Sequence, residues 1–126
     1  MSGLENLISY QKAFDLSMRI FEISKTFPEV EKFALISQIR RSSRSVCANM
    51  AEAYRKRQYE AHFQSKLSDA DAENSETIVW LHFSLYCGYI EKDAFADLKK
   101  LAIDIGKLLN YMIWHPQEFM LKHKNN

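Results

Sequence analysis

Apolar residues recur at steps of three and four positions in four separate stretches of the chain. This spacing places their side chains on one face of an α-helix. The pattern predicts helices at about residues 7–26, 31–55, 59–87 and 92–115. Pro28 ends the first stretch, Gly88 permits a turn after the third, and Pro116 ends the fourth. No stretch shows the alternation expected of a β-strand.

The number and length of these helices define the expected fold. Long helices joined by connections of a few residues are typical of an antiparallel, up-down-up-down four-helix bundle. A chain of 126 residues suits one domain, which we expect to span residues 1–126. The chain has only three glycines and two prolines, too few for the many tight turns of an all-β protein. The sequence therefore predicts an all-α fold.

The second stretch has two opposed sides, and we expect residues 32–57 to form one continuous helix. The opposite side from its apolar residues carries Arg40, Arg44 and Arg55, with Arg41 at its margin. The apolar side consists of Ile36, Ile39, Ser43, Val46, Met50 and Ala53. One helix thus combines a packing face with a basic face.

A polar row runs between these two sides. It consists of Gln38, Arg41, Ser45, Asn49 and Glu52. We expect Arg41 and Glu52 to contact groups on a neighbouring helix, such as Glu76 or Asn74. A polar network of this kind fixes register and partner choice more than it adds stability. A ligand site is the alternative interpretation.

The charge is divided unevenly along the chain. The whole protein carries a net charge of +1, but residues 32–57 carry seven basic residues against one acidic residue. Residues 58–90 carry five acidic residues against one basic residue. The two segments either attract each other, or the basic one forms a surface that contacts nucleic-acid phosphates by charge and shape rather than by base identity. The candidate nucleic-acid-binding residues are Arg40, Arg41, Arg44, Arg55, Lys56 and Arg57.

The end of the third stretch is apolar nearly all round. Val79, Trp80 and Phe83 point away from its main apolar row. A helix that is apolar on every side must be buried on every side, so we expect a second subunit to cover these three residues. The alternative is that helix ends and loops of the same chain cover them.

The chain lacks the motifs of metal sites and bound cofactors. Cys47 and Cys87 are too far apart to form a metal motif, and His62, His82, His115 and His123 are dispersed. We therefore expect neither a metal nor a cofactor. Two free cysteines indicate a reducing compartment, and the chain shows no signal peptide and no membrane-spanning stretch. These features predict a cytoplasmic protein.

One short pattern is typical of an enzyme. Arg57 and His62 match the Arg-x4-His spacing of HEPN-type ribonucleases, in which the arginine holds a phosphate and the histidine moves a proton. The pattern crosses the junction between the second and third stretches. The alternative is an unrelated surface arginine and surface histidine.

The run FPEVEKFALISQIRRSSRSVCANMAEA, residues 27–53, resembles the signature of a known family. These are four-helix bundle proteins first found as open reading frames in the intervening sequences of bacterial 23S rRNA, the S23-like proteins. Cys47 stands where a proline is frequent, Ala53 replaces a glycine, and Ala72-Glu73 replaces Gly-Ser. The matching positions are Phe27, Pro28, Glu31, Leu35, Gln38, Arg40, Arg41, Ser45, Asn49, Ala51 and Glu52, followed downstream by Phe63, Ala70, Glu76, Leu81, Gly88 and Tyr89.

The resemblance implies a bundle that assembles into a ring, commonly a pentamer. Distant relatives are accessory proteins of the reverse transcriptases of diversity-generating retroelements, and they contact nucleic acid and the polymerase. Most members have no assigned activity. The leading hypothesis is therefore a non-enzymatic homo-oligomer that binds RNA or a ribonucleoprotein. The alternatives are a protein-interaction scaffold without a nucleic-acid role and a ribonuclease that uses Arg57 and His62.

Overall fold

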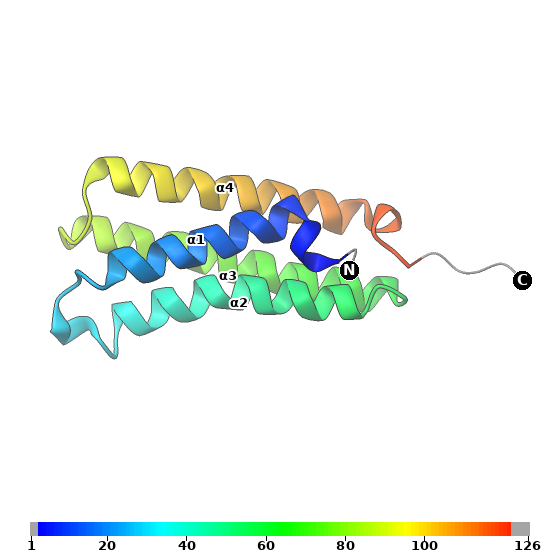
Figure 1. The fold of residues 1–126 in the computed structure, drawn as a ribbon, viewed down its shortest axis with the longest axis horizontal. Helices are drawn as coiled ribbons and strands as arrows, with labels where there is room; N and C mark the ends of the chain where they lie inside the picture. The colour runs from blue at the N-terminus through cyan, green and yellow to red at the C-terminus, as the bar shows by residue number, and fades with distance from the viewer. Residues whose placement is uncertain (1–2, 122–126) are drawn as a thin grey trace, which may run out of the picture.

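Four long α-helices lie side by side and form one antiparallel bundle in the computed structural model, which describes residues 3–121 (Figure 1). The all-α, up-down-up-down prediction is confirmed, and no strand occurs within residues 3–121. None of the helices in this range combines the length and apolar character needed to cross a membrane. The helices are α1 (Ile8–Ser24), α2 (Leu35–Arg55), α3 (Glu60–Tyr86) and α4 (Lys92–Trp114), with short 3-10 helices η1 (Leu4–Asn6), η2 (Glu29–Glu31) and η3 (Pro116–Glu118).

Each long helix packs against two neighbours and leaves one side open. The contacting pairs are α1 with α2, α2 with α3, α3 with α4, and α4 with α1, and the contact between α2 and α3 is the most extensive. This square arrangement leaves an outer face on every helix. The central layer of the bundle is filled by large apolar side chains such as Phe63, Leu16, Ile39 and Leu109, each at most 1% exposed.

The expected packing face of α2 is confirmed. All six of its predicted residues are buried, and they are Ile36, Ile39, Ser43, Val46, Met50 and Ala53. Their burial against α1 and α3 turns the opposite side of α2 outward. The apolar pattern of the sequence thus decides which side of α2 faces solvent.

The start of α2 differs from the prediction. The sequence predicts a helix from about residue 31, but residues 29–31 form η2 and α2 begins only at Leu35. Ala34 breaks the helical path with φ −122° and ψ −104°. Lys32 and Phe33 therefore precede the helix, and Lys56 and Arg57 follow it. The bounds of the other three helices agree with the prediction within two residues.

Glu31 explains this late start. One of its carboxylate oxygens accepts a hydrogen bond from the backbone N–H of Leu35 at 3.3 Å, and so satisfies a free donor in the first turn of α2. The other oxygen accepts a hydrogen bond from the hydroxyl of Tyr89 at 2.8 Å. The connections before α2 and after α3 lie at the same end of the bundle (Figure 1). Glu31 therefore fastens these two connections together.

Tyr89 is held on its other side by an aromatic contact and a tight turn. Its ring centroid lies 5.3 Å from that of Phe27. Gly88 has φ 78°, as the sequence predicts for a residue after a helix end. The N–H groups of Gly88 and Tyr89 donate to the carbonyls of Leu85 and Ser84, both at 2.9 Å, which is the Schellman pattern.

Replacing Gly88 tests this turn. Gly88→Ala is expected to lower the free energy of unfolding by about 1 kcal/mol, because a Cβ at positive φ is strained while the space around it is open. Gly88→Asn is the matched control and should cost less, because asparagine tolerates this conformation better. Urea denaturation of both variants measures the effect. Equal stability of Gly88→Ala and the wild type would contradict the assigned conformation.

The junction at Glu31 predicts a pH dependence. The hydrogen bond to Glu31 is the main cause that raises the pKa of Tyr89 from 10.0 to about 12. A phenol with a raised pKa stabilises the fold fully below pH 10, and this contribution is lost as the pH rises towards 12. Melting temperatures of wild type and Tyr89→Phe should therefore differ below pH 10 and converge above it. Glu31→Gln should move the phenolate absorbance of Tyr89 to lower pH, and an unchanged titration would refute the contact.

Candidate functional site

The cations on and just after α2 form three groups. Arg40 and Arg44 lie beside α1, Arg41 pairs with α3, and the third group is Arg55, Lys56 and Arg57 at the end of the helix. Arg40 turns towards α1, where its Nε donates to the Ser24 hydroxyl at 2.8 Å and its Nη2 donates to the Phe21 carbonyl at 3.4 Å. Half-buried Arg40 therefore ties α2 to the end of α1. No carboxylate within residues 3–121 pairs with it.

Three positive charges gather around the ring of Phe21. Lys25, Arg40 and Arg44 lie 4.7, 4.8 and 5.6 Å from its centroid, within the range of cation–π attraction. Lys25 pairs with Glu22 at 3.2 Å, but Arg40 and Arg44 have no ion pair in the described part of the chain. Two uncompensated guanidinium groups beside a third cation give this surface a local positive potential that favours anions.

Arg41 is engaged with α3 instead. Its Nη1 lies 3.2 Å from a carboxylate oxygen of Glu73, and its Nη2 lies 2.7 Å from one of Glu76. The hydrogen bond to Glu76 is the main cause that raises the pKa of Arg41 above its ordinary value. Of the six candidate nucleic-acid contacts, Arg41 is the one that the fold pairs with carboxylates, so it links two helices.

The rest of the polar row makes shorter-range contacts. The side-chain oxygen of Gln38 accepts from Arg41 Nε at 3.4 Å, and the amide of Asn49 donates to the Ser45 carbonyl of its own helix at 2.9 Å. Glu52 pairs with Lys66 of α3 at 3.0 Å, a partner that the sequence pattern does not single out. The row therefore meets α3 through Arg41 and Glu52.

Asn74 occupies a different place from the one expected. It is 2% exposed and donates its amide to the Ala102 carbonyl of α4 at 2.8 Å. It therefore joins α3 to α4 rather than to the polar row of α2. The prediction assumes that Asn74 faces α2, but helical spacing alone does not say which neighbour a polar core residue meets.

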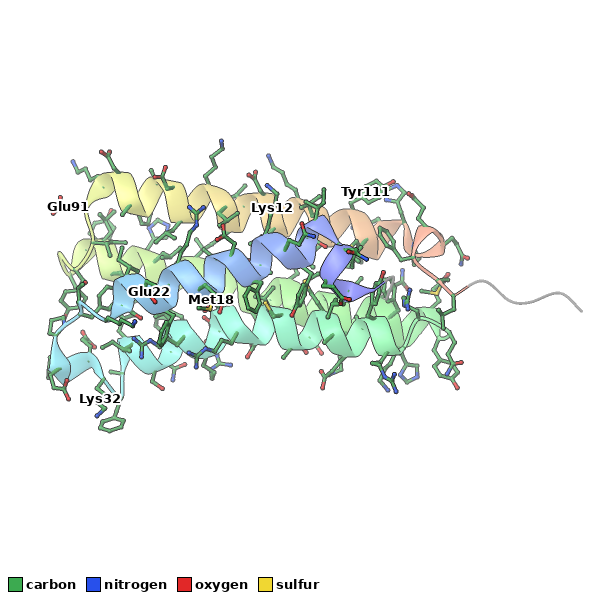
Figure 2. All side chains as sticks on the ribbon, in the orientation of Figure 1. Lys12, Met18, Glu22, Lys32, Glu91 and Tyr111 are labelled. Carbon is green, nitrogen blue, oxygen red and sulfur yellow. The ribbon has the colours of Figure 1, made fainter. Side chains whose placement is uncertain are left out.

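A groove runs along the outer face of the first half of α2. Its volume is about 600 Å³. Phe33, 87% exposed, stands at its start, and Lys32 projects from the turn before α2 at the outer edge of the bundle (Figure 2). The groove is lined by Lys32, Phe33, Ile36, Ser37, Arg40, Arg41, Arg44, Ser45 and Ala48. It thus combines cations, hydroxyl groups and one free aromatic ring.

A second basic group lies at the other end of α2. Arg55 and Lys56 are exposed and have no ion pair within residues 3–121. Arg57 donates to the Tyr54 carbonyl at 2.9 Å, and its guanidinium lies 3.7 Å from the centroid of the Tyr54 ring. Arg55 and Arg57 border a cavity of about 360 Å³ together with Tyr54 and Ala51. This group forms a smaller basic surface where α2 ends.

The residues of the Arg-x4-His pattern have separate partners. Arg57 stacks on Tyr54, whereas the ring of exposed His62 lies 5.7 Å from that of Tyr59. No hydrogen bond or ring contact joins Arg57 to His62 in the described structure. Residues 3–121 contain no group of three potential metal ligands, and His123 lies outside this range.

The apolar end of α3 stays partly open. Val79 and Phe83 are 48% and 53% exposed, and Trp80 is half-buried with its ring 5.8 Å from that of Phe83. Loops and helix ends of the described chain therefore cover these residues only in part. A hollow of about 260 Å³ lies beside them, bordered by Leu35 and Cys87 among others.

Sequence reasoning missed the residues that α1 and the turn contribute. Phe21 belongs to the apolar pattern of α1, and its position beside two arginines is a long-range contact without a local signal. Helical spacing places Lys32 and Phe33 inside a helix, where the structure does not have them. The hydrogen-bonding capacity of Glu31 four residues before Leu35 is the available sign of a later start.

Comparison with known proteins identifies the family of the chain. The family model of the 23S rRNA-intervening sequence protein matches residues 5–111. The chain belongs to this family. No curated protein sequence matches it. A crystal structure described as a protein with unknown function from the S23 ribosomal protein family of Bacteroides thetaiotaomicron is 29% identical, covers 88% of this chain and 99% of that one, and superimposes with a TM-score of 0.79.

Two residues that carry the resemblance to the S23-like family have structural contacts in this chain. Glu31 caps α2 and holds Tyr89, while Arg41 joins α2 to Glu76. These contacts maintain the bundle and leave Lys32 and Arg44 as exposed groove cations outside the ion pairs with α3. The family match thus agrees with the fold, and the groove is a separate feature of the surface.

Two substitutions on α2 distinguish a structural from a surface arginine. Arg41→Ala is expected to lower the free energy of unfolding by roughly 1 kcal/mol, because it leaves the carboxylates of Glu73 and Glu76 without a partner. Arg44→Ala removes the same charge but should change stability by only about 0.5 kcal/mol, because repulsion from Lys25 and Arg40 offsets part of its attraction to the ring of Phe21. Urea denaturation at low salt measures both. Equal effects of the two variants would contradict the division of the cations.

Proposed function

We propose that this protein is a non-enzymatic homo-oligomeric bundle that binds RNA, or the RNA of a ribonucleoprotein, through the groove of α2. The observation that carries the proposal is the gathering of Lys25, Arg40 and Arg44 around Phe21 with a single carboxylate, that of Glu22. Like charges held this close repel one another, and Arg40 and Arg44 of this cluster also line the groove, so an anion that enters the groove beside them lowers their energy. Phosphate groups of RNA supply such anions in a row.

The shape of the groove supports a polymeric ligand. From Ile36 to Ala48 it follows the helix for about 18 Å, given a rise of about 1.5 Å per residue. The groove cations Lys32, Arg40 and Arg44 follow one another along the groove, and this row suits successive phosphates better than a single small anion. The name of the family refers to 23S rRNA, and the similar crystal structure is described as that of a ribosomal protein family member. Both descriptions support RNA as the polyanion.

Oligomerisation supports the same function through avidity. The half-exposed side chains of Val79 and Phe83 on α3 provide an apolar surface that another copy of the chain would cover. Each copy then presents one groove, and several weak grooves on one assembly bind a long RNA far more tightly than one alone. The net charge of +1 gives little long-range attraction to RNA. Simultaneous binding by several grooves is therefore important for the affinity.

Removing two exposed cations from the groove tests the proposal. Lys32→Ala combined with Arg44→Ala should weaken the binding of a fluorescent RNA, measured by anisotropy across a salt series. The slope of log affinity against log salt should become shallower by about 1.4, because each phosphate contact on a single strand contributes about 0.7. Arg40 is left in place because it also holds α1.

The matched control removes the same charge from another face. Lys100 and Lys107 are exposed on α4, and Lys100→Ala combined with Lys107→Ala should leave both affinity and slope close to those of the wild type. If both double variants weakened RNA binding equally, binding would depend on the overall charge of the protein and not on the groove. The absence of RNA binding at low salt would exclude the proposal.

The second candidate function is a protein-interaction scaffold without a nucleic-acid role. The exposed Val79 and Phe83, with half-buried Trp80 beside them, favour it because they form a surface that suits a protein partner. Light scattering that detects an oligomer, together with no RNA affinity in the titration above, would support the scaffold. A monomer would remove its main argument.

A further inference from the structure

Phe33 is the most exposed large apolar side chain among the described residues, at 87%. It lies in the turn before α2 and borders the groove, and it is absent from the packed core. The Nζ of Lys32 lies 5.5 Å from its ring centroid. The exposed ring of Phe33 can stack on a flat π-system, and the neighbouring cations can bind negative charge.

The surroundings of Phe33 differ from those of the apolar surface on α3. Phe83 lies beside Trp80, so a protein partner covers both by burying apolar area. In the groove, Phe33 is followed instead by the hydroxyl of Ser37 and the guanidinium groups of Arg40 and Arg44. A ligand that matches this sequence of groups carries a flat π-system joined to a chain of anions. Nucleotides have both parts.

We infer that the groove takes an unpaired stretch of RNA, with one base stacked on Phe33 and the following phosphates against Arg40 and Arg44. This inference rests on the proposed function and names the class of RNA that the groove accepts. Arg44 is exposed and Arg40 is fixed to α1, so one cation is adaptable and the other is preorganised. The hydroxyls of Ser37 and Ser45 lie in the same groove and provide hydrogen-bonding groups for ribose.

A base-paired RNA does not offer the same contact. In a duplex both faces of each internal base are covered by neighbouring bases, and the deep, narrow major groove excludes protein side chains. Loops, bulges and ends expose base faces that stack on aromatic side chains. Every base has such a face, so stacking on Phe33 selects unpaired over paired RNA and does not select a particular sequence.

The experiment compares three fluorescent RNAs of equal length: an unstructured strand, a hairpin with a large loop, and a blunt duplex. Anisotropy should give similar affinity for the strand and the hairpin, and at least about tenfold weaker binding of the duplex. Phe33→Ala should weaken strand binding at least about fivefold, as expected from the loss of one base–aromatic contact. Phe33→Trp should retain or strengthen the binding.

The salt dependence separates stacking from charge. Phe33→Ala should leave the slope of log affinity against log salt unchanged, because a stacking contact releases no counterions. Trp114→Ala is the matched aromatic control, since Trp114 is 76% exposed at the far end of α4. It should bind like the wild type. Thermal melts by circular dichroism establish that Phe33→Ala stays folded, as expected for a side chain outside the core.

The results distinguish a failure of the stacking inference from a failure of the proposed function. Equal binding of strand and duplex, or an unchanged affinity of Phe33→Ala while the Lys32 and Arg44 double variant is weakened, overturns the stacking inference and leaves RNA binding through the phosphates. A shallower salt slope for Phe33→Ala would also overturn it, because the residue would then act by positioning cations. No binding of any of the three RNAs overturns both this inference and the proposed function.

Discussion

The two hydrogen bonds of the Glu31 carboxylate determine where α2 begins and how the groove beside it is laid out. One oxygen caps the first turn of α2, and the other holds Tyr89 after α3. A helix end that lacks such a partner leaves its first N–H groups unsatisfied, so the position of the carboxylate decides where α2 begins. Because α2 begins at Leu35, Lys32 and Phe33 stand outside the helix and form the start of the groove.

The same carboxylate explains which parts of the fold could be predicted from the sequence. The apolar faces follow helical spacing, and the six residues expected to bury α2 are all buried, because that spacing is a local property. The start of α2 depends on Glu31, which in turn is held by Tyr89, a residue 58 positions away in the chain. The spacing of apolar residues within one segment does not indicate a contact with a residue so far away in the chain. The predicted helix therefore begins four residues too early.

The candidate site was predictable only in outline for a similar reason. The basic side of α2 was expected, and Arg44 is indeed exposed there. Helical spacing places Arg41 in the polar row, and its expected contact with Glu76 of α3 is present, but the contact of Arg40 with Ser24 of α1 has no sign in that spacing. The flank that each residue joins depends on the neighbouring helices, whose order around the bundle the sequence alone does not specify.

The two explanations of the uneven charge each describe part of the surface. Attraction between α2 and α3 accounts for Arg41 with its two carboxylates and for Glu52 with Lys66. It does not account for Arg40 and Arg44, because the acidic residues of α3 lie on the other flank of α2. These two arginines face α1, where the ring of Phe21 offers an attraction of about 0.5–1 kcal/mol at an exposed site.

The arrangement around Phe21 would link the stability of the bundle to any anion bound there. Arg40 and Arg44 of α2 contact the end of α1, where Lys25 also lies over the ring of Phe21, so these cations cannot move far apart without loosening that contact. The folded chain thus retains a local repulsion that cation–π contacts and one carboxylate only partly offset. An anion bound there relieves the repulsion in the folded state alone, and a ligand that binds only the folded state stabilises it. An anion bound there would therefore be coupled to the packing of α1 on α2 through Arg40 and Arg44.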